Sequence, residues 1–521
     1  MAACASVSSE EVKVERFISP GRGNGLRARS EIKPGQLIYS SQPIAFCVAQ
    51  KFLKSTCQTC LCRGESLLRC SQCKSSRFCS VQCQKEAWPQ HKRECKCLQR
   101  VYPRVPTDSV RLAARIIFTL LNDPAADSQE LYSITQHQSH LEEMSEEKRE
   151  GLVQLCSMLK LYLDSDVPQL PSGLDPMSLL ARVMCNCFSV SDGELQDVGL
   201  GLYPSMSLLN HDCRPNCVMM FVGKKLELRA VRRIQPFEEL CISYTDILAP
   251  RVERRAQLMD QFYFLCQCQR CSDDQSDCTM LGGEESRWTI IRDSLPHLET
   301  LRHEEKWAEL KQACQALIGE NSAAVPDSNV YMLRVLDSLM DACISLSQYE
   351  TALQYGTRTL TAYLLHYPDP HPSHAVELLR VAKLQHYSGD VEQAERTFTQ
   401  ACQALIGENS AAVPDSNVYM LRVLDSLMDA CISLSQYETA LQYGTRTLTA
   451  YLLHYPDPHP SHAVELLRVA KLQHYSGDVE QAERTFTQAY DVMKVTHGSD
   501  HPLVSEVCRK LAECQAERQR L

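Results

Sequence analysis

The stretch Asn210-His211-Asp212-Cys213-Arg214-Pro215-Asn216-Cys217 carries the information that decides the fold of this chain. A glycine-containing run, Gly199 to Pro204, precedes it, and strand-like alternation from Leu226 to Val231 follows it. Two acidic residues and a tyrosine come next, Glu238, Glu239 and Tyr244. The alternative is an unrelated β domain with a coincidental Asn-His-x-Cys, but the length and order of the pattern favour a single functional unit.

A metal-binding pattern closes this region. Cys266, Cys268 and Cys271 supply three thiolates, and a tetrahedral zinc site needs four ligands. Cys213 is the candidate for the fourth position. Because all four ligands would be protein thiolates, we expect a structural zinc rather than a catalytic one.

A denser set of metal-ligand residues lies earlier in the chain. Eight ligands suffice for two tetrahedral zinc sites, and such a short segment would depend on the metals for its folding energy. The eight candidates are Cys57, Cys60, Cys70, Cys73, Cys79, Cys83, His91 and Cys95. Spacing alone does not fix which four share an ion. The segment Ser80 to Arg93 is expected to form a helix that carries Cys83 and His91.

Two further patterns precede this set. The glycine run Gly21 to Gly25 leads to a Pro34-Gly35 turn, and its glycines would let the backbone approach a ligand closely. As a dinucleotide fingerprint the run fails, because its third glycine comes one residue early and no βαβ unit surrounds it.

The bulk composition limits the class of protein. A chain of 521 residues exceeds what one hydrophobic core supports, so two or more domains are expected. The chain shows no secretory signal and no membrane-spanning run, which predicts an intracellular location where its 27 cysteines stay reduced. A net charge of −10 argues against a globally basic nucleic-acid binder.

Together these motifs resemble the SMYD family of protein lysine methyltransferases. The resemblance implies an α+β fold: a β-rich SET core split by a MYND zinc finger and a helical insert, then a post-SET zinc segment and an all-α, tetratricopeptide-like domain. The implied segments are a flexible N-terminus at 1–11, SET at 12–56 and 186–249, the MYND finger at 57–95, the insert at 96–185, the post-SET segment at 250–275 and the helical domain at 280–521.

The resemblance also assigns roles to individual residues. Cys57, Cys60, Cys79 and Cys83 would hold one zinc, and Cys70, Cys73, His91 and Cys95 a second, leaving Cys62 and Cys97 outside both sites. With the Cys213 site this makes three zinc ions. Tyr244 would be catalytic, with Phe188 and Phe262 as walls of the lysine channel. S-adenosylmethionine would be bound by Arg22, Gly23, Asn24, Tyr132, His140, Asn186, Asn210, His211, Tyr244 and Phe264.

Three positions depart from the family pattern. Phe262 replaces a tyrosine of the lysine channel, and we expect Tyr263 to point to the opposite face because adjacent residues on a strand alternate. His140 replaces an asparagine of the cofactor pocket. Phe237 replaces a glycine before the acidic pair, which would strain a turn that requires a positive φ.

The last part of the chain contains an exact repeat. From about Glu285 the apolar residues follow helical spacing, and residues 313–400 recur without any change as 401–488. Exact identity indicates a recent duplication or a gene-model error, since packing does not preserve every residue. We expect both copies to form similar helix pairs.

The predicted function is transfer of methyl groups from S-adenosylmethionine to lysines of histone and non-histone proteins. The alternative is a weakly active or inactive scaffold or transcriptional cofactor. Proline-rich peptides or a chaperone are candidate partners, and nucleic acid is a candidate for the basic patch formed by Lys85, Lys92, Arg93, Lys96, Arg100 and Arg104. We expect a monomer in the cytoplasm and nucleus, without membrane contact.

Overall fold

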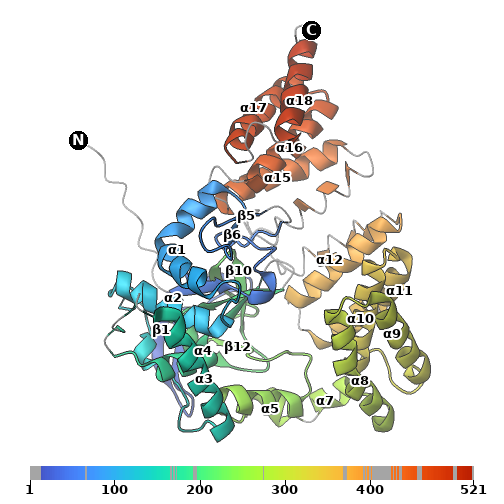
Figure 1. Ribbon diagram of the computed structural model, residues 1–521. Helices are drawn as coiled ribbons and strands as arrows, with labels where there is room; N and C mark the ends of the chain where they lie inside the picture. Colours follow the sequence, from blue (N-terminus) through green and yellow to red (C-terminus); the bar gives the residue numbers. More distant parts are fainter. Residues whose placement is uncertain are drawn as a thin grey trace.

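Figure 1 shows the computed structural model of the chain. It describes residues 13–518, except 65–66, 129, 165–166, 168–169, 172, 192–195, 274, 368–371, 391–392, 395, 398–399, 402–423, 426–427, 430, 433–436, 455–459 and 497–501. The N-terminus predicted at 1–11 lies outside the described residues.

The β core is assembled from two segments that are far apart in the sequence. Its first strands are β1 (Val14–Ser19), β2 (Gly23–Ala28), β3 (Leu37–Ser41) and β4 (Ala45–Val48). Its later strands are β7 (Phe188–Ser191), β8 (Asp197–Leu202), β9 (Asn210–His211), β10 (Cys217–Val222), β11 (Lys225–Ala230) and β12 (Cys241–Ile242). Antiparallel pairing of β3 with β11 and of β4 with β8 joins the two segments into one core.

Local sequence explains several of these strands. Val222 pairs with Lys225 in the β10–β11 hairpin, so Gly223 and Lys224 form a two-residue turn. Gly223 adopts the φ of +58° that such a turn requires. The strands are ordered β10-β11-β3 and β4-β8-β7 in two three-stranded sheets, and β9 lies parallel to β12. Most apolar residues of these strands share one buried core that includes Leu26, Val190 and Leu228, whereas Cys47 of β4 and Leu202 of β8 pack with the helices of the insert.

The segment between β4 and β7 forms the zinc-ligand region and a group of helices. Its elements are η1 (Gln50–Phe52), β5 (Leu68–Arg69), β6 (Arg77–Phe78), α1 (Val81–Val101), α2 (Asp108–Asn122), η2 (Ile134–Gln136), α3 (Glu146–Leu163) and α4 (Pro176–Asn186). The predicted helix at Ser80 to Arg93 is present but longer. It begins where the Ser80 hydroxyl accepts a hydrogen bond from the Cys83 amide, as N-cap residues do, and continues to Val101.

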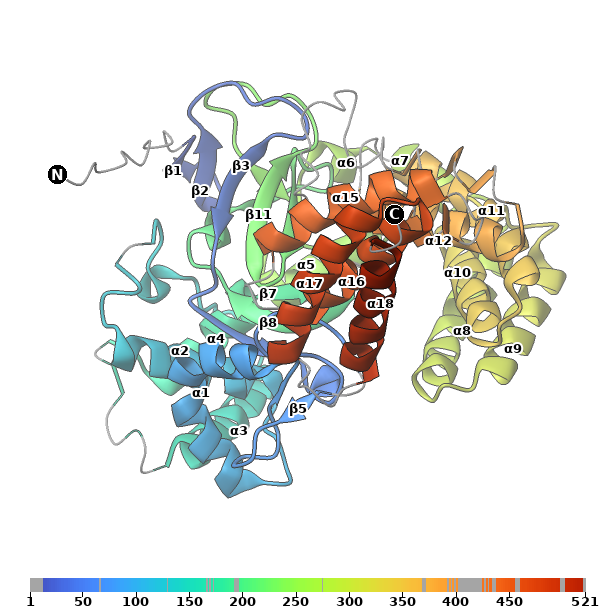
Figure 2. The ribbon, with the colours of Figure 1, turned by 90° about the horizontal axis from the view of Figure 1, so that it is seen from above.

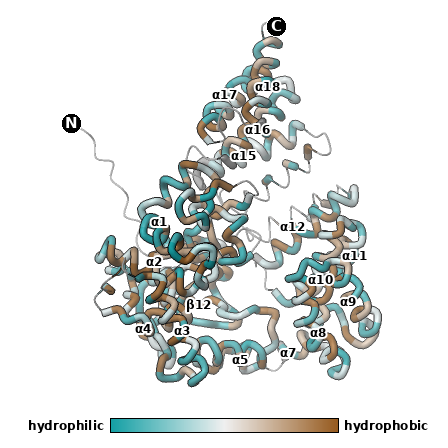
Figure 3. Tube along the Cα trace, in the orientation of Figure 1, coloured by the Kyte–Doolittle hydropathy of each residue, from teal (hydrophilic) through white to brown (hydrophobic). Residues whose placement is uncertain are grey.

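A short run of helices follows the β core. It consists of α5 (Arg251–Phe262), α6 (Gln269–Ser272) and α7 (Gln275–Met280), whereas the short helix η4 (Met206–Leu208) lies within the core between β8 and β9. Helix α5 is coloured mainly teal in Figure 3, which agrees with the burial of only Arg254 and Leu258 on it. Figure 1 shows α5 leading from the core toward the C-terminal helices.

The described C-terminal region is entirely helical, as predicted. Its helices are α8 (Glu285–His303), α9 (Trp307–Asn321), α10 (Val330–Ser345), α11 (Tyr349–His366), α12 (Pro372–Tyr387), α15 (Tyr437–His454), α16 (Pro460–Tyr475), α17 (Val479–Thr496) and α18 (Pro502–Arg518). Successive helices pack against one another as pairs, the arrangement typical of helical repeats. Figures 1 and 2 show two groups, α8 to α12 and α15 to α18.

The two copies of the repeat form the same helices where both are described. Helices α11 and α15 have identical sequences, and so do α12 and α16. The second-copy counterparts of α9 and α10 fall mostly outside the described residues.

Candidate active site and zinc clusters

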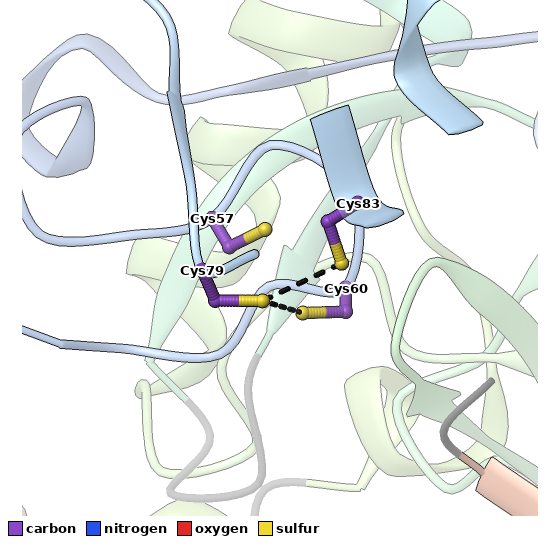
Figure 4. A group of neighbouring side chains, drawn as sticks. All are labelled: Cys57, Cys60, Cys79 and Cys83. Atoms are coloured by element: carbon purple, nitrogen blue, oxygen red, sulfur yellow. Dashed lines mark hydrogen bonds between the residues drawn. The ribbon is translucent and has the colours of Figure 1, made fainter. Parts of the chain in front are cut away.

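The first cysteine cluster joins a loop, a strand end and the start of α1. Cys57, Cys60, Cys79 and Cys83 place their sulfur atoms within 4.8 Å of one another (Figure 4). The Sγ atoms of Cys79 and Cys60 are 3.5 Å apart, and those of Cys79 and Cys83 are 3.4 Å apart. Four thiolates this close suit a tetrahedral zinc. Cys62 borders the cluster, since its carbonyl accepts a hydrogen bond from the Cys57 amide.

The second cluster interleaves with the first along the chain. It consists of Cys70, Cys73, His91 and Cys95, all of them buried. The sulfur of Cys73 lies 3.7 Å from His91 Nε2, and those of Cys70 and Cys95 are 3.7 Å apart. The two clusters match the interleaved sets that the sequence resemblance implied.

The third cluster links the segment that follows β9 to the residues around α6. Cys213 lies 4.0 Å from Cys266 and 3.5 Å from Cys271, and Cys268 completes the group. The fully buried Arg254 guanidinium lies 3.3 Å from the Cys213 sulfur. A positive charge at this place offsets the excess negative charge of four thiolates around a divalent ion. Arg254 was not identified from sequence, because its spacing on a polar helix resembles that of a surface residue.

Two side-chain amides and the acidic pair organise the core beside this cluster. Asn210 Nδ2 donates to Glu239 Oε1 at 2.8 Å and to the Asn24 carbonyl at 3.1 Å. Asn216 donates to Glu238 Oε1 at 3.1 Å and accepts from the Cys241 amide at 2.8 Å. The acidic pair therefore fixes the loop that carries the decisive sequence stretch.

His211 holds the catalytic candidate in place. Its Nδ1 accepts a hydrogen bond from the Tyr244 amide at 2.9 Å, and its Nε2 lies 3.1 Å from the Cys213 sulfur. Burial lowers the pKa of His211 to about 4, so the imidazole is neutral near pH 7. Since both ring nitrogens face protein atoms, a ligand would meet the face of this ring or the backbone beside it.

Tyr244 is the centre of an aromatic group. Its ring centroid lies 4.7 Å from that of Phe262, 5.3 Å from that of His211 and 6.4 Å from that of Phe264. Its hydroxyl donates to the Leu209 carbonyl at 2.5 Å. Burial raises the pKa of Tyr244, which keeps the hydroxyl protonated as a donor.

The residues after α5 correct one expectation. Phe262 and Tyr263 do not lie on a strand: α5 ends at Phe262, and Tyr263 adopts the left-handed conformation with φ +59° and ψ +34°. The Tyr263 ring nevertheless points away from Tyr244, because it stacks on His140 at 5.1 Å. The sequence Phe-Tyr-Phe resembles a strand, but the helix end determines its conformation. Phe237 has the predicted positive φ, at +63°.

The remaining cofactor candidates form a partly connected group. Arg22 Nη1 lies 3.3 Å from the His211 carbonyl, Gly23 has a φ of +79°, and the Asn24 side chain accepts from Arg16 at 2.9 Å. Arg16 also lies over the Tyr132 ring at 4.9 Å, so it bridges two candidates. No sequence motif identified Arg16.

Three candidates have their contacts elsewhere. Asn186 donates to the Gln138 carbonyl at 2.9 Å, and Phe188 packs edge-on against Tyr203 at 5.7 Å. His140 contacts Tyr263 and lies 3.6 Å from Glu143. The structure thus brings Arg22, Asn24, Asn210, His211, Tyr244, Phe262 and Phe264 into one connected group of contacts.

Comparisons with known proteins agree with this geometry. The family model described as SET domain matches residues 23–245, so the chain is a SET-domain protein. Human Histone-lysine N-methyltransferase SMYD3 is 45% identical over 395 residues, which cover 75% of this chain and 92% of that protein. Pig (Sus scrofa) N-lysine methyltransferase SMYD2 is 33% identical over 374 residues, covering 68% and 85%. The chain belongs to the SMYD family.

One solved structure has a related description. The SET domain of LSMT bound to Lysine and AdoHcy is 13% identical, covers 75% of this chain and 89% of its own, and gives a TM-score of 0.27.

Proposed function

We propose that the chain transfers methyl groups from S-adenosylmethionine to lysine side chains of histone and non-histone proteins. Its relatives carry the names histone-lysine and N-lysine methyltransferase. The observation that supports the proposal most strongly is the buried Tyr244, held through its backbone by His211 and surrounded by Phe262 and Phe264.

The residues around the β1–β2 turn suit the amino-acid end of S-adenosylmethionine. A Cβ built on Gly21 or Gly23 would meet no atom within 4 Å, so a ligand can approach this backbone. Arg22 offers a cation for a carboxylate, and Glu239, 3.8 Å from it, offers an anion for an ammonium group. Bound there, S-adenosylmethionine would supply an electrophilic methyl group on a sulfonium.

The chain's own groups would prepare the lysine. Phe262, the proposed channel wall beside Tyr244, excludes water from the amine, and this desolvation lowers the pKa of a lysine in the channel and yields the neutral nucleophile. The Tyr244 hydroxyl, whose proton is donated to the Leu209 carbonyl, would orient that amine by accepting one of its N–H groups, and in-line alignment would supply most of the rate enhancement.

The three cysteine-rich clusters would each hold one zinc ion of the structural type. Their donor sets contain only thiolates and one imidazole, which are the ligands zinc prefers. The domain limits stated from sequence remain predictions.

Partners and location remain proposals as well. Helix α1 exposes Lys85, Lys92 and Lys96 for nucleic acid or an acidic partner, whereas Arg100 donates to the Tyr162 and Leu163 carbonyls.

Proline-rich peptides and a chaperone are proposed partners of the finger and of the helical domain, and the chain is proposed to be monomeric. Among the described helices, none combines the length and the apolar character needed to cross a membrane. A location in both cytoplasm and nucleus suits histone and non-histone substrates.

The experiment is methyl incorporation into peptide arrays by wild type and Tyr244→Phe, with Tyr475→Phe as control because Tyr475 is 61% exposed. We expect activity in the wild type and in the control, and at least about a hundredfold loss in Tyr244→Phe. If none of the three enzymes transfers methyl groups although the cofactor still binds, the inactive scaffold would be supported instead.

A further inference from the structure

The three aromatic residues at the end of α5 divide between two sides of the chain. Phe262 and Phe264 face Tyr244, whereas Tyr263 between them faces the helical insert. The left-handed backbone at Tyr263 produces this division, since it turns the chain sharply between the two phenylalanines. The position of Tyr263 therefore affects where the rings of Phe262 and Phe264 lie.

Residues of the helical insert hold the Tyr263 ring. His140 stacks on it with ring centroids 5.1 Å apart and an interplanar angle of 25°. Lys148 Nζ lies 5.4 Å from its centroid and donates to Asp260 Oδ1 at 2.6 Å. We name His140, Lys148, Asp260 and Tyr263 the Tyr263 clamp. It joins the N-terminal turn of α3 and the loop before it to the C-terminal turn of α5.

The backbone at both stacked residues is unusual. Tyr263 has a φ of +59° and His140 a φ of +50°, a conformation that favours glycine or asparagine. Bulky residues persist there when the surrounding contacts determine their position. Two such residues that contact each other indicate a local arrangement held by their mutual packing. A third contact, from the Cys185 thiol to the Gln261 carbonyl at 3.7 Å, holds the same turn from α4.

We propose that Tyr263 is a positioning residue, which His140 and Lys148 hold so that Phe262 and Phe264 lie against Tyr244. The inference rests on the proposed methyl transfer, because the aromatic walls are those of the proposed lysine channel and cofactor pocket. It gives His140 a role in the clamp in place of the cofactor contact predicted from sequence.

Kinetic measurements on variants separate a positioning role of Tyr263 from a general contribution to stability. Tyr263→Asn keeps a residue that tolerates the left-handed backbone but removes the ring, and Tyr263→Phe keeps the ring. We expect kcat to fall about tenfold in Tyr263→Asn and to stay within about twofold in Tyr263→Phe. His140→Ala combined with Tyr263→Asn should be no worse than Tyr263→Asn alone. Wild-type kcat in Tyr263→Asn, with unchanged numbers of methyl groups added, would overturn the proposal.

Hydrogen exchange tests the clamp without any activity. In the zinc-loaded full chain, Lys148→Met and His140→Ala should each speed amide exchange at residues 260–264 by about tenfold, because the turn loses its support. Lys160→Met, an exposed lysine on the same helix, is the control and should leave that exchange unchanged. Unchanged amide exchange at residues 260–264 in both variants would contradict the claim that the clamp holds this turn. A wild type that transfers no methyl group while the clamp variants still exchange faster would overturn only the proposed function.

Discussion

Glu94 and Arg111 form an ion pair of 3.1 Å in which both side chains are fully buried. Arg115 pairs with the same carboxylate, and His91 Nδ1 of the second zinc cluster lies 3.8 Å from it. Arg111 also donates to the Val48 carbonyl of β4 at 2.9 Å. Burial alone would raise the pKa of Glu94, but the Arg115 and Arg111 guanidinium groups lower it well below its usual range. One carboxylate thus connects the zinc finger with the β core.

Glu94→Gln should destabilise the chain by about 3 kcal/mol, because it leaves two guanidinium groups buried without a full counter-charge. Urea unfolding followed by circular dichroism measures this, and zinc release to a chelator reports the finger separately. Glu86→Gln, on the exposed face of the same helix, is the control and should change stability by less than about 0.5 kcal/mol. Equal stability of the two variants would contradict a connecting role.

Phe262→Tyr should reduce the number of methyl groups added to each lysine. The Phe262 ring lies 4.7 Å from that of Tyr244, so a new hydroxyl would narrow the proposed channel and offer the amine a second hydrogen-bond partner. Mass spectrometry of a methylated peptide gives the product distribution. Phe237→Tyr, at a side chain that is 61% exposed, should leave that distribution unchanged. The same products from all three enzymes would refute the assignment of Phe262 to the channel.

Phe237→Gly should be more stable than Phe237→Ala by about 1 kcal/mol. Both changes remove the contact between the Phe237 ring and Arg27, so the comparison isolates the cost of a φ of +63°. Thermal unfolding of the two variants measures the difference. A more stable alanine variant would show that this turn carries no backbone strain.

Because His137 is buried in its neutral form, the free energy of unfolding should fall in mild acid. Burial lowers the pKa of His137 from 6.5 to about 4, so the folded chain binds fewer protons than the unfolded chain in that window. Its contribution is fully present above pH 6.5 and is lost as the pH falls toward 4. Between pH 7 and 5.5 the wild type should lose about 1 kcal/mol more than His137→Gln. His297→Gln, at an exposed histidine, should behave like the wild type in the same urea titrations.

The repeat offers a matched pair of substitutions. Arg380 donates to Glu377 at 2.8 Å, and its counterpart Arg468 donates to Glu465 at 2.8 Å. Each glutamate is buried, so Arg380→Met and Arg468→Met should each cost about 2 kcal/mol. Calorimetry of both variants measures the costs. An Arg468→Met variant as stable as the wild type would show that the second copy does not pack like the first.

The sequence predicted best what depends on local spacing. Close pairs of zinc-ligand candidates, such as Cys57 and Cys60, follow from local spacing, because turns and helix faces bring such ligands together. The division of the twelve candidates into three sets was implied by the family resemblance, and the structure places them in those sets. Tyr244 and His211 were identified from an ordered motif, and the structure explains that order through the hydrogen bond between them.

The remainder depends on contacts between distant residues of common types. Arg254, Arg16 and Glu94 resemble surface charges in sequence, and only the packing of separate elements shows their partners. The conformation at Tyr263 escaped prediction because an aromatic run suggests a strand, whereas the end of α5 sets the backbone there.

The third cluster has a consequence for synthesis on the ribosome. Cys213 cannot complete its ligand set until Cys266, Cys268 and Cys271 have emerged, and Phe262 and Phe264 reach Tyr244 only at that stage. The first two clusters, by contrast, have all their ligands once Cys95 has been made. A nascent chain therefore contains every ligand of the first two clusters well before it contains the residues that surround Tyr244, so a ribosome stalled between Cys95 and Cys266 would carry both of these ligand sets but no complete aromatic group.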